Sequence, residues 1–138
     1  MKHLSSARFS TIALLAAVCI VSVACGYSSK TTPPVAGTVP TIAQLNPDSA
    51  TAGAAAFTLT VNGTNFGTKA VVNWNGAAQS ATTYVSGSKL TVAIPASLIE
   101  NAGAVSVTVT NPGTAGTGIY GTGATLPETS TAMSFTIN

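Results

Sequence analysis

The chain has 138 residues, of which 6% are charged and 46% hydrophobic, and its formal net charge is +2. That length suits one domain of ordinary size. Lys2 and Arg8 account for the excess charge, so the chain after residue 24 is neutral, with three lysines against three carboxylates. Because nucleic-acid binding draws on clustered lysine and arginine, the composition argues against a nucleic-acid partner.

The first 24 residues are arranged like a secretory signal. Lys2, His3 and Arg8 precede an apolar stretch, residues 9–24, that ends in small residues. This is the order of a charged region, a hydrophobic region and a cleavage zone. An uncleaved membrane anchor is the alternative, but the stretch is shorter than the roughly 20 apolar residues that a spanning helix needs. We therefore predict that residues 1–24 are a signal peptide and that the protein is exported.

Cys25 is the one cysteine that would remain after cleavage, because Cys19 lies inside the apolar stretch. A single thiol forms no internal disulfide. With His3 removed, the thiol also lacks a histidine base for nucleophilic catalysis and a partner for structural zinc. Residues 22–24, SVA, fit the small-x-small rule for a cut before Cys25 and resemble a bacterial lipobox. The resemblance implies that Cys25 is the lipid attachment site; a free or intermolecular thiol and a residue without a special role are the alternatives.

The lipobox resemblance also bears on location. Ser22 stands where lipoboxes usually carry leucine, and Gly26 rather than aspartate follows the cysteine. By the sorting rule of Gram-negative lipoproteins, that glycine implies the outer membrane if the host is Gram-negative. Two or three acyl chains hold a protein stably on a bilayer, whereas one gives only marginal binding. We expect an exported protein that is anchored to a membrane of the cell envelope.

Residues 25–38 read as a tether that carries the lipidated Cys25. The stretch YSSKTTPPVAGT, residues 27–38, has no hydrophobic period and contains two adjacent prolines among serine and threonine. Such segments stay extended and solvated. We predict a disordered tether between the membrane and a domain at residues 39–138.

From residue 39 onward, apolar residues recur with the period of two that is typical of strands with one buried face. Asn75 and Gly76 tolerate positive φ, so we predict a tight turn there, followed by a return strand that ends near Tyr84. Only residues 95–103, PASLIENAG, could form a helical turn. The fold class is therefore all-β, with about seven short strands in a β-sandwich. The other strand segments are 41–46, 57–61, 90–94, 105–109 and 133–137.

The chain carries six motifs in this order: IAQLNPDSATAG, FTLTVNGTNFG, VVNWNGAA, LTVAIPASLI, AVSVTVTNPG and SFTIN. Together they resemble the IPT/TIG family of immunoglobulin-like domains. The resemblance spans Pro40 to Asn138 and implies an immunoglobulin-like β-sandwich that serves in binding or structure, as in bacterial surface proteins and beside extracellular enzymes. The residues fit their positions in the motifs, because glycine at 63 and 67 allows the strand to bend at residues 62–67 and Pro112 ends a strand.

The sequence departs from the family in residues 114–131, which form a long, glycine-rich loop. Loops of more than about 12 to 15 residues are often binding loops or flexible segments. Tyr120 in this loop is a candidate ligand contact, because Tyr84 and Tyr120 are the aromatic side chains that we expect to be exposed. Trp74, by contrast, shares a strand face with apolar neighbours and is expected in the core.

The remaining acids give little basis for catalysis. Asp48 is explained by a turn, Glu100 follows the helical turn and Glu128 lies in the long loop, so nothing places two carboxylates on one face. We expect no catalytic residues, no metal site and no cofactor. The predicted function is a non-enzymatic cell-envelope lipoprotein, a monomer whose domain is a structural module or binds a protein or polysaccharide partner. The alternative is a carbohydrate-binding module, which would need Trp74 and Tyr120 exposed and coplanar.

Overall fold

The computed structural model describes residues 32–117 and 122–138. Cys25 and Tyr120 lie outside these residues. In the described part, the secondary structure consists of short strands and one turn of 3-10 helix. The elements are β1 (Thr41–Asn46), β2 (Ser49–Ala50), β3 (Phe57–Thr64), β4 (Val71–Trp74), β5 (Ala77–Ala78), β6 (Thr82–Ser86), β7 (Lys89–Ile94), η1 (Ala96–Leu98), β8 (Gly103–Asn111), β9 (Glu128–Thr129) and β10 (Met133–Ile137).

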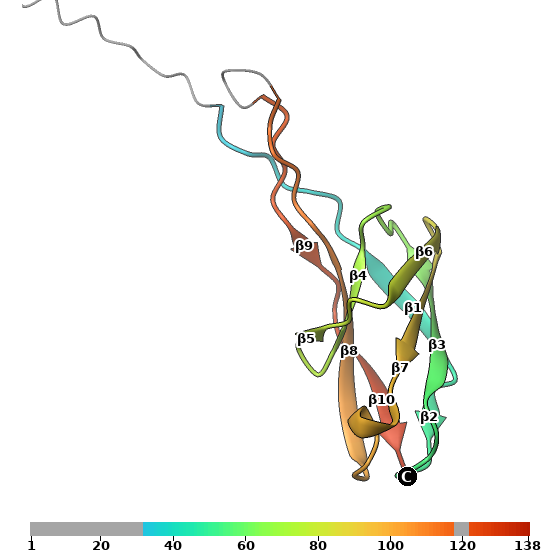
Figure 1. Cartoon of the computed structure of the whole chain (residues 1–138). Helices are drawn as coiled ribbons and strands as arrows, with labels where there is room; N and C mark the ends of the chain where they lie inside the picture. Colours follow the sequence, from blue (N-terminus) through green and yellow to red (C-terminus); the bar gives the residue numbers. More distant parts are fainter. Residues whose placement is uncertain (1–31, 118–121) are drawn as a thin grey trace, which may run out of the picture.

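The strands form two sheets that pack face to face, as Figure 1 shows. The four-stranded sheet has the order β1-β3-β7-β6, and the second sheet has the order β2-β10-β8-β4-β5 with β9 also paired to β8. Pairing is antiparallel except between β2 and β10. The predicted all-β sandwich of the immunoglobulin type is confirmed.

The predicted alternation places the apolar side chains between the sheets. Leu59 and Val61 of β3 are fully buried, whereas Thr58 before them is exposed and Thr60 between them is half-buried. Phe135 of β10 lies at the centre, with its ring centroid 4.9 Å from that of Trp74 and 5.6 Å from that of Phe57. Trp74 is only 3% exposed, so its predicted position in the core is confirmed. Burying such side chains contributes about 1.5–3 kcal/mol each.

The predicted hairpin at Asn75 and Gly76 is only partly correct. Both residues have positive φ, 50° and 82°, as a tight two-residue turn requires. The return strand, however, is limited to β5, after which the chain crosses to the other sheet and β6 pairs with β7. Thr82 helps the crossing, because its hydroxyl accepts a hydrogen bond from the Val72 amide (3.1 Å). A period of two gives the face of a strand but not its partner, so the sequence could not reveal this switch.

The sandwich has two distinct ends. One end, the far pole, consists of the turn after β1, η1 and the residues up to Gly103; Gly53 N–H donates to the carbonyl of Ile99 there (2.8 Å). The other end, the arm pole, consists of residues 62–69, the β6–β7 turn and the segments that follow β8. In Figure 1 the C-terminus and η1 lie at the lower end, and residues 32–40 enter at the upper end. Across residues 32–117 and 122–138, the structure has no helix with the length and apolar character to cross a membrane.

Candidate functional site

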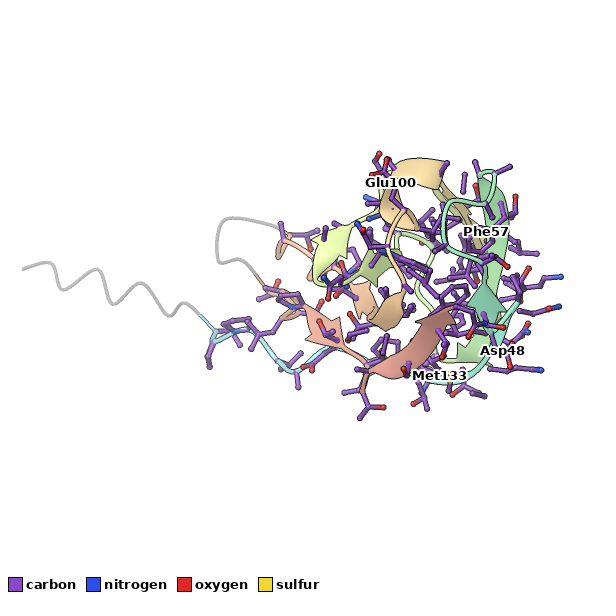
Figure 2. The ribbon with its side chains drawn as sticks, turned by 90° about the horizontal axis from the view of Figure 1, so that it is seen from below. Asp48, Phe57, Glu100 and Met133 are labelled. Carbon is purple, nitrogen blue, oxygen red and sulfur yellow. The ribbon has the colours of Figure 1, made fainter. Side chains whose placement is uncertain are left out.

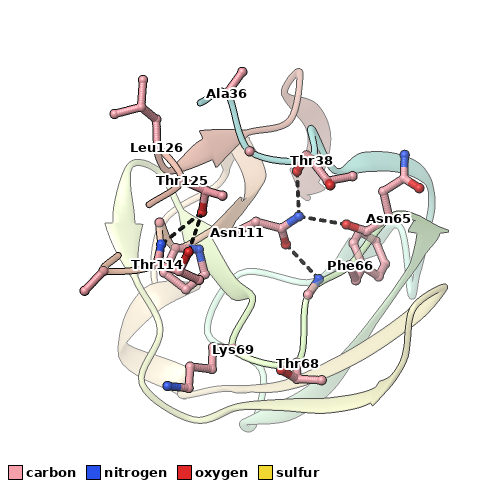
Figure 3. A pocket seen from close by; sticks show the side chains of 15 residues that line it. Ala36, Thr38, Asn65, Phe66, Thr68, Lys69, Asn111, Thr114, Thr125 and Leu126 are labelled. Carbon is pink, nitrogen blue, oxygen red and sulfur yellow. Dashed lines mark hydrogen bonds between the residues drawn. The ribbon is translucent and has the colours of Figure 1, made fainter. Parts of the chain in front are cut away.

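The side chain of Asn111 joins three segments at the arm pole. Asn111 is the last residue of β8, and Pro112 after it cannot continue a strand ladder. The Oδ1 of Asn111 accepts a hydrogen bond from the Gly67 N–H (2.8 Å), and the Nδ2 of Asn111 donates to the carbonyls of Thr38 (2.8 Å) and Asn65 (2.7 Å). Figure 3 shows these bonds converging on the one amide. A single side chain therefore connects the N-terminal segment, the turn after β3 and the end of β8.

The turn after β3 uses its glycines differently from the prediction. The unusual backbone angle falls on Asn65, with φ 61°, and not on Gly63 or Gly67. Gly63 is needed for space instead, because a Cβ there would collide with the carbonyl oxygen of Thr41 and lie 2.6 Å from the Phe66 ring. The irregularity in the pairing lies on the opposite strand, in β1, where the register shifts between Ile42 and Gln44.

Beyond Asn111 the chain leaves the sandwich as a paired ribbon, which we call the arm and define as residues 113–117 and 122–126. Thr114 and Thr125 exchange both backbone hydrogen bonds (3.1 and 3.0 Å), and Thr117 N–H donates to the carbonyl of Thr122 (2.9 Å). The hydroxyls of Thr114 and Thr125 are also bonded (2.9 Å). The long segment predicted as a loop is thus largely ordered by pairing in its described part, with β9 continuing toward the sandwich.

Residues 32–40, which we call the linking segment, run beside the arm (Figure 1). Val35 N–H donates to the carbonyl of Ala124 (3.0 Å), and Leu126 N–H donates to the carbonyl of Val35 (2.9 Å). Residues 25–38 are predicted as a disordered tether, and the structure differs from that prediction at Val35, which has two backbone partners on the arm. No feature of the sequence indicates this pairing, since proline, threonine and glycine around Val35 show no strand period.

Two glycines let the linking segment and the arm approach each other closely. A Cβ on Gly37 would lie 2.5 Å from the carbonyl oxygen of Leu126. A Cβ on Gly113 would collide with the carbonyl oxygen of Thr125 and lie 3.0 Å from the nitrogen of Pro127. Side chains essentially never make such contacts, so both positions require glycine unless the backbone moves.

A groove of about 740 Å³ lies between the arm and the turn after β3. Backbone, methyl groups and hydroxyls make up most of its wall, and among the described residues that line it Lys69 is the charged one. These groups can donate and accept hydrogen bonds but have no pair of acids for proton transfer. Residues 32–117 and 122–138 contain no cluster of three His, Cys, Asp or Glu side chains with metal-binding geometry. The residues that line the groove and are labelled in Figure 3 are Ala36, Thr38, Asn65, Phe66, Thr68, Lys69, Asn111, Thr114, Thr125 and Leu126.

The structure places the other candidate residues as follows. Asp48 and Glu100 both lie at the far pole, on either side of Phe57 in Figure 2, while Glu128 lies in β9 near the arm. Tyr84 is 37% exposed, as predicted. The carbohydrate-binding alternative required an exposed Trp74, and this requirement is contradicted by its burial.

Sequence reasoning missed the residues that build the arm pole. In the motif AVSVTVTNPG, Asn111 and Pro112 predict the end of a strand but no role for the Asn111 side chain. The one available signal was an amide side chain directly before a proline, since such a residue can bond backbone groups that a strand no longer satisfies.

In a comparison with known families, the model of the IPT/TIG domain matches residues 40–126. Searches of curated proteins and of solved structures gave no match.

Proposed function

The chain belongs to the IPT/TIG domain family, and from that premise we propose that it is a non-enzymatic lipoprotein of the cell envelope. Its immunoglobulin-like domain would serve there as an interaction or structural module for an envelope protein or polysaccharide. Acylation at Cys25 would hold it on a membrane, with residues 1–24 removed as a signal peptide.

The observation that carries this proposal is how the linking segment joins the sandwich. Hydrogen bonds from Asn111 to Thr38 and from Asn65 to Val39 fix the segment at the arm pole (2.8 and 3.3 Å). The far pole lies at the opposite end of β8. A domain that is held by its N-terminal side presents the far pole and both sheet faces away from its anchor, which suits a module that displays a binding surface.

The distribution of acids supports a role in binding rather than catalysis. Asp48 and Glu100 are both exposed at the far pole, and Glu128 is half-buried at the root of the arm. The paired carboxylates of glycoside hydrolases lie within about 5 to 10 Å of each other around one substrate, and Glu128 is at the opposite pole from Asp48 and Glu100.

Mass spectrometry of the N-terminal peptide from isolated membranes tests the proposal. We expect a peptide that begins at Cys25 and carries two or three acyl chains, and Cys25→Ser should move the protein from the membrane to the soluble fraction. Cys19→Ser, a change in the leader, is the matched control and should leave anchoring intact. A peptide that begins at Met1, or an unmodified Cys25 in membrane-bound protein, would contradict the proposal.

A further inference from the structure

The direction of the linking segment limits which end of the domain can face a membrane. Residues 25–31 lie between Cys25 and the first described residue. Seven extended residues reach at most about 25 Å. β8 has nine residues, and a strand of that length spans about 30 Å between the poles. An anchor on Cys25 therefore keeps the arm pole near the bilayer and cannot bring the far pole onto it.

Charged side chains in the described part of the chain are divided between the poles. Lys69 lines the groove, and Lys89 lies opposite Asn62 beside the β6–β7 turn, so both exposed lysines belong to the arm pole. Asp48 and Glu100 are exposed at the far pole. The half-buried Glu128 is the single acid near the arm. The arm pole is thus the cationic end of the described part of the chain.

Large apolar side chains are exposed on the same half of the molecule. Val35 and Leu126 pair through their backbones and are 59% and 48% exposed. Val39 in the linking segment is 51% exposed, and the edge strand β6 contributes Tyr84 and Val85 beside the turn that precedes Lys89. Apolar groups and tyrosine next to lysines are typical of surfaces that lie at a membrane interface.

We propose that the arm pole is a membrane-docking surface that binds anionic phospholipid headgroups through Lys69 and Lys89. Val35 and Leu126 lie against the interfacial region of the bilayer. The inference rests on the proposed function, because it is the anchor that brings this pole to the bilayer. Each lysine near an anionic surface multiplies the docked population about fivefold, so the docked orientation depends on lipid charge and the far pole is left free for a partner.

The experiment tethers the mature chain, residues 25–138, to lipid nanodiscs. The Cys25 thiol is coupled to a maleimide phospholipid, so the tether is present whether or not cells acylate the cysteine. A gadolinium-chelating lipid in the disc broadens amide NMR signals near the bilayer. We compare discs of phosphatidylcholine alone with discs that contain phosphatidylglycerol, because the tether acts equally on both and headgroup charge acts only on the second.

On the anionic discs we expect the broadening at Lys69, Lys89 and Leu126 to rise by about threefold or more over that on neutral discs. Broadening at Asp48 and Glu100 should stay low. The double variant Lys69→Glu/Lys89→Glu should lose the increase, while the matched far-pole variant Asp48→Asn/Glu100→Gln should retain it. Unchanged chemical shifts of core amides verify that each variant is folded.

Equal broadening on both kinds of disc would overturn the inference, as would an increase that survives the lysine reversal or one that is larger at the far pole. The outcome is separate from the test of the proposed function. An unmodified Cys25 in cells would remove the natural anchor without changing the nanodisc result, and a charge-independent nanodisc result would remove the docking surface while leaving acylation intact.

Discussion

The sandwich and the arm both consist of paired strands, but different interactions stabilise them. Between the sheets, side chains such as Phe135, Leu59 and Val107 are fully buried and exclude water. In the arm, the exposed Thr114 and the half-buried Thr125 are held by backbone and hydroxyl bonds, and the exposed Val35 of the linking segment pairs with the arm through its backbone. Apolar burial is cooperative and contributes to global stability, whereas exposed hydrogen bonds contribute about 1 kcal/mol each and open locally. The sandwich and the arm are therefore both ordered but differ in the free energy needed to open them.

The largest effect should come from removing the central ring of the sandwich. Phe135→Ala leaves a cavity beside Trp74 and Phe57, and we expect the free energy of unfolding to fall by about 3–5 kcal/mol. Urea denaturation followed by circular dichroism measures the loss. Thr136→Ala, the exposed neighbour in β10, is the control and should change stability by no more than about 1 kcal/mol. A comparable loss in both variants would mean that the core does not dominate stability.

A glycine at the boundary between the two regions gives an intermediate test. Gly63→Ala places a methyl group against the Thr41 carbonyl and the Phe66 ring, so we expect a loss of about 1–3 kcal/mol in the free energy of unfolding. Gly87→Ala in the nearby β6–β7 turn is matched, because the nearest atom to its new Cβ would be 3.8 Å away. If the two alanine variants have the same melting temperature, close approach at Gly63 is not a constraint.

The smallest global effect and the clearest local one should follow from Asn111→Ala. The variant frees the amide of Gly67 and the carbonyls of Thr38 and Asn65, all of which water can reach in part. We expect amide hydrogen exchange at Val35 and Thr125 to accelerate about tenfold while core amides keep their protection. Asn73→Ala, which removes bonds to Thr108 and Thr110 on the sheet face, is the control. Unchanged exchange on the arm would show that Asn111 does not hold it.

The fold was predictable because its determinants are local. Alternation in residues 57–61 and 90–94 predicted which side chains face the core, and Asn75-Gly76 predicted the turn. Choice of partner is not local, since Thr82–Ser86 would alternate in the same way in either sheet. This explains why the crossing between β5 and β6 was missed.

The arm pole was less predictable for a related reason. Its contacts join residues far apart in sequence, such as Thr38 with Asn111 and Val35 with Leu126, through backbone groups that every residue type carries. Threonine and glycine are compatible with strand, turn or disorder, so composition alone favoured a loop. Only the three-dimensional structure reveals that one asparagine amide satisfies three of these backbone groups.

The burial of Trp74 against Phe135 has a practical consequence. Trp74 is the only tryptophan in the chain, so its indole, which is shielded from water, is the intrinsic fluorescent probe of the fold. Its emission should lie at short wavelength in the native protein and shift to the red when the two sheets separate. Because the indole is remote from the arm, local opening of the arm should leave the emission spectrum unchanged. Fluorescence can then distinguish unfolding of the whole domain from local opening without any added dye.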